Sequence, residues 1–271
     1  MAFFWQSIVH DLLNVIILAV VQGLTEFLPV SSSGHLVIAQ HLLGVKEPGI
    51  TLEIWLHIGT LFSILFFYRS VITAVIKGLF KWERQSVLIS SAVLVSMVPA
   101  VVFYFFCQDF LEGFYKYPRG TASLMIFTGV VLISLRWVRC REGELTISRA
   151  VMAGLAQALA LFPGISRSGM TISAARALGI SPVKAAEFSF LMVIPLLIGA
   201  ASKDYWGYMR QASAVAGESS VGLLALAIGV VVSAAVGYFA LKAVVRVLND
   251  ERFWMFGIYC VLAGALAVVL L

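Results

Sequence analysis

Residues 22–44 read QGLTEFLPVSSSGHLVIAQHLLG, and residues 157–179 read QALALFPGISRSGMTISAARALG. Shifted by 135 residues, the two stretches align without a gap and share 9 of 23 positions. The polar and glycine identities carry the argument, because Leu and Ala match by chance in apolar sequences. They are Gln22 with Gln157, Ser31 with Ser166, Ser33 with Ser168, and Gly34 with Gly169. Since the offset is close to half of the 271 residues, the sequence predicts an internal repeat.

The composition around these stretches is that of a membrane protein. The chain is 61% hydrophobic and 12% charged, with a mean hydropathy of +0.99, whereas a soluble domain carries about 25% charged residues. The net charge of +5 comes from Lys and Arg in short gaps between apolar runs, so no nucleic-acid partner is expected. The apolar runs predicted to span the bilayer are 52–68, 87–106, 121–138, 183–202, 221–246 and 253–271.

The two repeated stretches interrupt apolar helices with turn-forming residues. In 12–44 an apolar helix ends at the cluster PVSSSG, and in 148–179 another ends at PGISRSG. Pro and Gly break helices, and Ser favours helix caps. The apolar stretches that follow have about 10 residues, which is too short to span a bilayer. Both regions are therefore predicted to be re-entrant helical hairpins.

Each half of the chain then has one hairpin and three spans. Because three is an odd number, the second half enters the membrane upside down. The predicted fold is an all-α polytopic membrane protein with an inverted-topology repeat, six transmembrane helices plus two re-entrant helical hairpins. We expect a single membrane domain, 1–271, with one repeat at about 10–140 and the other at about 147–271. Such repeats place the functional site near the midplane, between them.

Charge indicates an orientation. The gaps 69–86 and 136–149 are rich in Lys and Arg and are predicted to be cytoplasmic, whereas the gaps 107–120 and 203–220 are balanced and predicted to be outside. Hairpin 12–44 then enters from outside, and both termini lie outside. The two polar tips would meet within the bilayer.

Ionisable residues lie at both predicted tips. Glu26, His35 and Arg167 would each cost at least about 2.5 kcal/mol at membrane depth, and such groups usually mark function. The alternative is a buried ion pair that only joins the hairpins. The repeats differ here: Glu26 aligns with Leu161, and Ser32 aligns with Arg167. One tip has the acid and the other the cation, a division expected of a catalytic site and not of a symmetric pore.

The tips also suit a phosphate or diphosphate. Helices are predicted to start near Gly34 and Gly169, and helix N-termini present free backbone N–H groups to anions. Arg167 adds a planar fork that matches phosphate oxygens. The hydroxyls predicted to bind phosphate are those of Ser31, Ser33, Ser166, Ser168 and Thr171.

Residues 22–35, QGLTEFLPVSSSGH, and 163–171, PGISRSGMT, resemble the two signature motifs of bacterial undecaprenyl-diphosphate phosphatase, the integral-membrane family also known for bacitracin resistance. The resemblance covers essentially the whole chain. It implies hydrolysis of undecaprenyl diphosphate to undecaprenyl phosphate and inorganic phosphate, which recycles the lipid carrier for peptidoglycan synthesis and confers bacitracin resistance. It also implies Mg or Ca as a divalent cation, a homodimer, and the bacterial inner membrane. The charge bias of the connecting gaps predicts that the site opens to the periplasmic face.

The match to the family motifs is direct at most positions. Gln22 departs from it, because the family often has Glu there, so a mechanism that needs two carboxylates on this helix is in question. Ser32 is the preferred nucleophile, with His35 and water as alternatives. Glu26 is either the base or, together with Gln22, a candidate for holding the metal, and the spacing does not choose between these roles. The directly matching residues are Glu26, Ser32, His35, Ser166, Arg167, Ser168 and Thr171.

A rival function is a transporter or flippase of a prenyl phosphate lipid, because inverted repeats are common in transporters and fold does not fix function. Outside the tips, Glu53 and Glu187 begin the spans that follow the two hairpins. We expect both carboxylates to bind the hairpin backbone, and His57 to pair with Glu53.

Overall fold

The computed structural model describes residues 2–45, 50–115, 117–139, 142–212, 223–249 and 252–271. These residues form helices, joined by short turns and a single β-bridge between Gly143 and Ile180. The helices are α1 (Ala2–Phe27), α2 (Ser32–Leu42), α3 (Ile50–Phe67), α4 (Arg69–Phe80), α5 (Arg84–Tyr115), α6 (Pro118–Ser134), the 3₁₀ helix η1 (Leu135–Trp137), α7 (Ile147–Leu159), α8 (Arg167–Ala177), α9 (Pro182–Ala212), α10 (Leu223–Asn249) and α11 (Met255–Leu270).

The helix lengths and their apolar character are those of a multi-pass membrane protein. Among the described residues, four helices are long and apolar enough to cross a bilayer, and α3 with α4 makes a fifth if this pair, bent by 73°, is one span. α11 falls short at 16 residues. The all-α membrane class is therefore confirmed. The four spans are Arg84–Leu111, Pro118–Trp137, Pro182–Gly199 and Leu223–Leu248.

The segment 69–86 differs from the expectation of a plain connecting gap, because residues 69–80 form the helix α4. The 12 residues of α4 are too few to span a bilayer, and a basic residue lies near each end of the helix. Helix α1 also begins earlier than expected, at Ala2, and runs for 26 residues.

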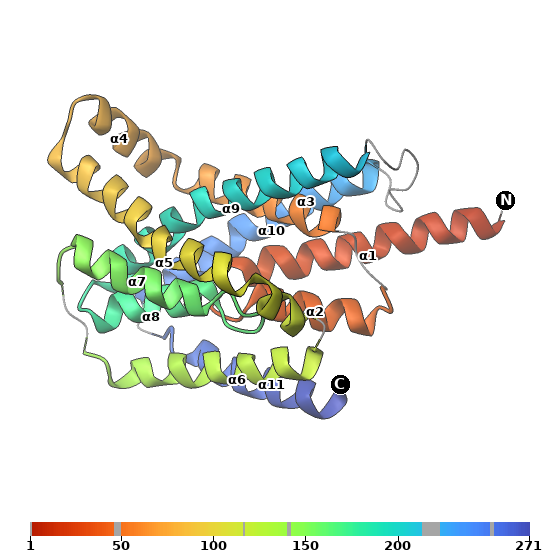
Figure 1. Cartoon of the computed structure of the whole chain (residues 1–271). Helices are drawn as coiled ribbons and strands as arrows, with labels where there is room; N and C mark the ends of the chain where they lie inside the picture. The colour runs from red at the N-terminus through yellow and green to blue at the C-terminus, as the bar shows by residue number, and fades with distance from the viewer. Residues whose placement is uncertain (1, 46–49, 116, 140–141, 213–222, 250–251) are drawn as a thin grey trace.

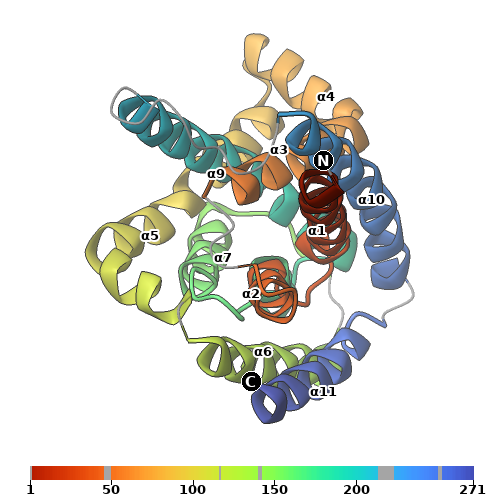
Figure 2. The ribbon, with the colours of Figure 1, turned by 90° about the vertical axis from the view of Figure 1, so that its right-hand side faces the viewer.

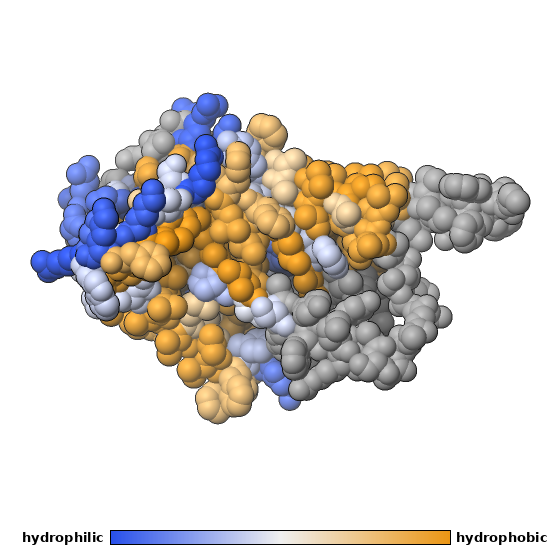
Figure 3. All heavy atoms as spheres, turned by 90° about the horizontal axis from the view of Figure 1, so that it is seen from above, coloured by the Kyte–Doolittle hydropathy of each residue, from blue (hydrophilic) through white to orange (hydrophobic). Residues whose placement is uncertain are grey.

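Hydrophilic residues gather at one end of the molecule (Figure 3). The α4–α5 turn, η1 and the C-terminal end of α10 lie at this end, whereas both chain termini lie at the other. Between the ends, Figure 3 shows a broad surface of apolar residues. The α1–α2 hairpin is open towards the end with the termini, and the α7–α8 hairpin is open towards the hydrophilic end (Figure 1).

Corresponding helices of the two halves pack in corresponding ways. α1 packs on α10, and α7 packs on α5. A shift of about 135 residues relates α1 to α7 and α5 to α10. Seen from the end with the termini, α2 and α7 lie inside a ring of the longer helices (Figure 2). The hairpin tips are thus enclosed in the interior.

Helices α6 and α11 approach closely through glycine. An added Cβ on Gly129 would lie 2.6 Å from the Gly257 carbonyl oxygen, and one on Gly257 would lie 2.5 Å from that of Gly129. Small residues let transmembrane helix backbones approach in this way. The contact positions α11, which reaches the functional site.

We therefore expect Gly129→Leu to force these helices apart and to destabilise the protein by about 1–3 kcal/mol, as overpacking does. The measurement is the midpoint of thermal unfolding in detergent. The control is Val130→Leu, because Val130 lies on the same helix with 57% of its surface exposed. Equal midpoints for the two variants would contradict the close α6–α11 contact.

Candidate active site

Each hairpin tip is closed by a serine cap. Ser31 caps α2 and its Oγ accepts the Gly34 N–H at 3.2 Å, and Ser166 caps α8 and accepts the Gly169 N–H at 3.1 Å. These are aligned pairs of the repeat. Ser31 also has φ 70, a left-handed conformation that is uncommon for residues with a Cβ. Strained backbone of this kind often occurs at functional sites.

The two tips touch. Ser168 Oγ of the second tip donates a hydrogen bond to the Leu28 carbonyl of the first, at 3.2 Å. The second tip is also fixed to α6, since Thr128 Oγ1 donates to the Gly164 carbonyl at 3.0 Å and accepts the Ser166 N–H at 3.1 Å. Residues that are 140 positions apart in the chain therefore share one polar cluster.

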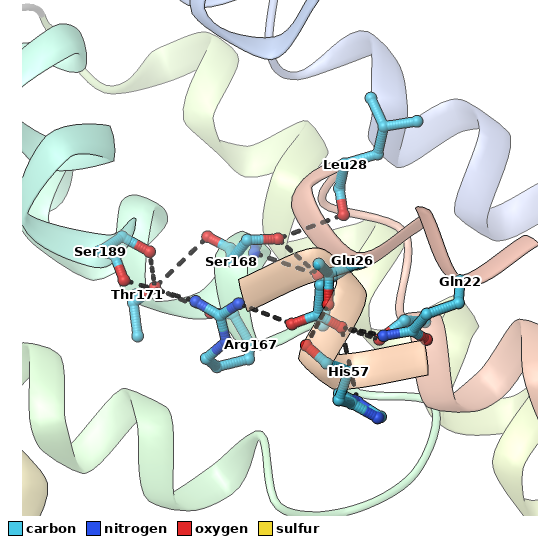
Figure 4. A network of polar contacts seen from close by, with 12 residues as sticks. Gln22, Glu26, Leu28, His57, Arg167, Ser168, Thr171 and Ser189 are labelled. Atoms are coloured by element: carbon cyan, nitrogen blue, oxygen red, sulfur yellow. Dashed lines mark hydrogen bonds and ion pairs between the residues drawn. The ribbon is translucent and has the colours of Figure 1, made fainter. Parts of the chain in front are cut away.

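Glu26 is the centre of this cluster (Figure 4). Its Oε1 accepts a hydrogen bond from Arg167 Nη2 at 3.0 Å, which is also an ion pair across the two tips. Its Oε2 accepts Ser32 Oγ at 2.7 Å and Gln22 Nε2 at 3.1 Å. The Glu26 side chain is 6% exposed and that of Arg167 is 12% exposed. A buried carboxylate thus holds a hydroxyl on one oxygen and a guanidinium on the other.

The second repeat has no carboxylate at the position that corresponds to Glu26. Gln157, the aligned partner of Gln22, is also buried, but neither polar atom of its amide has a hydrogen-bond partner among the described residues. The reason lies in the sequence, because the residue aligned with Glu26 is Leu161. Only one carboxylate therefore serves the paired tips.

His57 joins the site, which the sequence did not predict. Its Nε2 lies 3.8 Å from Glu26 Oε2, and its Nδ1 lies 2.7 Å from the Glu53 backbone carbonyl. Because a carbonyl only accepts, Nδ1 carries the proton in this contact. The expected pairing of His57 with Glu53 thus uses the Glu53 backbone. The Glu53 carboxylate accepts Gln40 Nε2 at 2.9 Å, so its hairpin partner among the described residues is a side chain and not the backbone.

His35 lies at the tip but has no described hydrogen bond to Glu26. Its Nδ1 lies 2.8 Å from the Ser31 carbonyl, and its Nε2 lies 2.7 Å from the hydroxyl of Tyr259 on α11. The two rings are stacked, with centroids 5.7 Å apart. Both ring nitrogens are therefore occupied by partners other than Glu26. Tyr259 is a second site residue that sequence reasoning missed, because only packing brings α11 to this tip.

Most of the hydroxyls predicted to bind phosphate already form hydrogen bonds within the protein. Ser31 and Ser166 are caps, Ser168 joins the tips, and Thr171 Oγ1 donates to the Arg167 carbonyl at 2.8 Å. All four residues are buried. Ser33 is half-buried, and its Oγ lies 3.4 Å from Ser31 Oγ. Ser168 and Thr171 would donate to a phosphate only by exchanging these bonds, whereas Ser31 and Ser166 accept in theirs and keep their O–H groups as donors.

The described residues contain no group of three or more His, Cys, Asp and Glu side chains placed to hold a metal ion. The oxygen donors at the centre are the Glu26 carboxylate and its neighbours Ser32 and Gln22. The amide oxygen of Gln22 is buried and has no partner within the described part of the chain. One carboxylate with neutral oxygens suits Mg²⁺ or Ca²⁺ that is held jointly with substrate phosphates.

Two clefts lie away from the tips. One of about 570 Å³ is lined by the start of α5 and by residues 144–147 before and at the start of α7. A smaller one, of about 100 Å³, is lined by Lys184 and Glu187 among others. The predicted bond from Glu187 to the hairpin backbone is not found among the described hydrogen bonds; this carboxylate faces the smaller cleft instead.

Comparison with known proteins places the whole chain in one family. A family model described as bacitracin resistance protein BacA matches residues 15–266. The undecaprenyl-diphosphatase of Salinibacter ruber is 35% identical over 272 residues, covering 95% of this chain and 98% of that protein. The undecaprenyl-diphosphatase of Rhodopirellula baltica is 38% identical over 264 residues, covering 96% and 98%. That of Carboxydothermus hydrogenoformans is 36% identical, covering 95% and 96%. This chain belongs to the family of bacitracin resistance protein BacA.

Proposed function

We propose that this protein hydrolyses undecaprenyl diphosphate to undecaprenyl phosphate and inorganic phosphate, and so recycles the lipid carrier for peptidoglycan synthesis and confers bacitracin resistance. The relatives that match nearly the full chain are named undecaprenyl-diphosphatase. The observation that carries the proposal is the arrangement at Glu26, which holds the Ser32 hydroxyl at 2.7 Å on one oxygen and Arg167 at 3.0 Å on the other. It combines a nucleophile, a base and a phosphate-binding cation.

The proposed reaction has two steps. The diphosphate competes with Glu26 for Arg167, which leaves the carboxylate free to act as a base. Ser32 Oγ attacks the terminal phosphorus and passes its proton to Glu26, and undecaprenyl phosphate leaves with the electrons of the broken P–O bond. Water then attacks the phosphoserine, and the Ser32 oxygen leaves with the proton that Glu26 returns. The protons of the water leave with the inorganic phosphate, so the Ser32 hydroxyl and the Glu26 carboxylate are both restored. Arg167 neutralises the charge on the phosphoryl oxygens in both steps.

The alternatives for the nucleophile are His35 and a water molecule. His35 is disfavoured, because its nitrogens face the Ser31 carbonyl and the Tyr259 hydroxyl and neither has a described bond to Glu26. Direct attack by water would use the same base and the same cation. The two remaining schemes give the same products and differ in one intermediate, a phosphoserine at position 32.

The finer fold prediction belongs to the same proposal. We keep the inverted repeat, with one repeat at about 10–140 and the other at about 147–271, and its six spans and two re-entrant hairpins. We also keep its place in the bacterial inner membrane, with the site open to the periplasmic face. Support comes from the two hairpins, which open towards opposite ends (Figure 1), and from the basic segments at one end, which is then cytoplasmic. A homodimer follows from the family resemblance.

Tyr259→Phe is expected to lower the hydrolysis rate about 5-fold, because it removes one hydrogen bond, to His35, worth about 1 kcal/mol, and keeps the ring. The measurement is kcat for phosphate release. Tyr238→Phe is the matched control, since the Tyr238 ring packs on Phe66 and Phe67 and its hydroxyl has no described hydrogen bond to a tip residue. A Tyr259→Phe rate equal to that of the control would show that the His35 contact has no part in catalysis.

Activity is expected to depend on a divalent cation. Where bound, Mg²⁺ or Ca²⁺ would be held by the diphosphate and the amide oxygen of Gln22, and would neutralise phosphate charge. In the alternative in which Glu26 is not the base, its carboxylate would be a further ligand. Removal of cations with a chelator is expected to reduce phosphate release about 100-fold or more, because such neutralisation contributes several kcal/mol. Re-addition of Mg²⁺ or Ca²⁺ should restore it. Full activity in excess chelator would contradict the cation proposal.

Product analysis separates hydrolysis from the rival transport function. Purified protein in detergent, incubated with undecaprenyl diphosphate, is expected to produce inorganic phosphate and undecaprenyl phosphate in a one-to-one ratio. A flippase would bind the lipid and form neither product. The two functions share an architecture, and this assay tests the chemistry alone.

A further inference from the structure

Helix α4 does not continue the helix before it. The pair α3 and α4 is bent by 73° at Tyr68, and α4 then packs on the first part of α5. Gly78 makes this packing close, because an added Cβ would overlap the Ser86 Oγ. One side of α4 is thereby covered by protein, and the rest is exposed at the hydrophilic end of the molecule (Figure 1).

The exposed surface of α4 and the turn after it divides into two stripes. An apolar stripe contains Ile76, Leu79 and Phe80, which share a helix face at spacings of three and four. Phe80 is 84% exposed, and so is Trp82 in the following turn. Lys77 and Lys81 are exposed beside this stripe, four residues apart. Exposed apolar and aromatic side chains flanked by cations are typical of a helix that lies in a membrane interface.

The charge of this segment is strongly one-sided. Between residues 69 and 84 there are four cationic side chains and one carboxylate, that of Glu83. None of the four cations forms an ion pair with another described residue. Unpaired cations of this kind attract the negatively charged lipids of a membrane leaflet. The four are Arg69, Lys77, Lys81 and Arg84.

We propose that the exposed face of α4 is a docking surface for anionic phospholipid headgroups. Phe80 and Trp82 enter the headgroup region, and Lys77 and Lys81 contact lipid phosphates. The surface is separate from the tips, because none of its residues contacts Glu26, Ser32 or Arg167 in the described structure. The occupant is a phospholipid of the surrounding bilayer, since the surface is exposed and flanked by apolar side chains.

The test uses the full-length protein in detergent micelles doped with either phosphatidylglycerol or phosphatidylcholine, and measures the unfolding midpoint. A lipid that binds the folded protein raises this midpoint. We expect phosphatidylglycerol to raise it more than phosphatidylcholine does, and we expect the difference to shrink in high salt, because salt screens exposed charges.

Two variants and a control test whether the charges of α4 and the turn after it cause the stabilisation by phosphatidylglycerol. Lys77→Gln with Lys81→Gln is expected to raise the phosphatidylglycerol concentration for half-maximal stabilisation about 10-fold or more, since each cation near a charged surface contributes about 5-fold. Glu83→Gln should lower that concentration. Arg119→Gln, which removes an exposed cation at the start of α6, should leave it unchanged. Equal responses of the wild type and the double variant, or equal stabilisation by both lipids, would overturn the proposal.

Discussion

Replacing Arg167 with alanine is expected to lower kcat/KM for undecaprenyl diphosphate about 10³-fold or more, the scale at which arginine stabilises phosphoryl transfer. Arg167 is the only cation bonded to Glu26 by a described hydrogen bond, and it comes from the opposite hairpin tip. Its loss removes the charge that neutralises the phosphoryl oxygens. It also leaves the buried Glu26 carboxylate without its ion pair.

Two further variants separate these effects. Arg167→Lys keeps the charge but loses the planar fork, and is expected to recover only part of the activity. Arg119→Ala, at an exposed position on α6, is the control for a lost arginine. An Arg167→Ala protein that unfolds at a lower midpoint than the wild type but retains full activity would show that the ion pair merely joins the hairpins.

Ser32→Ala is expected to abolish formation of a phosphoenzyme and to reduce kcat about 10³-fold or more, because the nucleophile acts together with its base. The substrate KM should change little, since Arg167 remains in place. The measurement is trapping of acid-stable phosphoserine with a substrate labelled in the terminal phosphate. Ser123→Ala is the matched control, because Ser123 lies on α6 outside the tips and its hydroxyl donates to the Arg119 carbonyl.

The variant Glu26→Gln tests whether Glu26 is the base for Ser32. If Glu26 is the base for Ser32, the double variant Glu26→Gln with Ser32→Ala should be little slower than either single variant, because groups that act as a unit are not additive. An acid-labile phosphohistidine in the Ser32→Ala protein would assign the attack to His35. Normal turnover by Ser32→Ala without any phosphoenzyme would assign it to water.

The sequence predicted the two tips because their chemistry is local. Serine caps, helix-breaking Pro and Gly, and polar residues repeated in register all act within a few residues of the chain. The structure accordingly brings Glu26, Ser32 and Arg167 together. The division of the acid and the cation between the repeats was also visible in the alignment, since Leu161 stands opposite Glu26.

The residues that were missed reach the site through packing. His57 comes from α3 and Tyr259 from α11, and neither lies within a motif. The periodicity of an apolar helix does not say which polar side chain faces a distant tip. The helix α4 and the bend before it were missed for a related reason. The basic residues of α4 are equally typical of a loop between two spans.

The hydroxyls illustrate a third limit of sequence patterns. A Ser/Gly-rich tip indicates an anion site and a helix cap equally well. In the structure Ser31 and Ser166 are used as caps, and Thr171 bonds to its own helix. The sequence thus predicted where the hydroxyls lie, whereas their hydrogen-bond partners could be identified only from the structure.

The most direct test of a hydrolytic site shared between the two tips is the rate of phosphate release from undecaprenyl diphosphate by purified protein in detergent. Wild type, Ser32→Ala and Arg167→Ala would be compared at equal amounts of folded protein, so that each tip is changed once. We predict release by the wild type with Mg²⁺ or Ca²⁺, and loss of release in both variants. No release from folded wild type that still binds the lipid would contradict the account and make lipid transport the leading function.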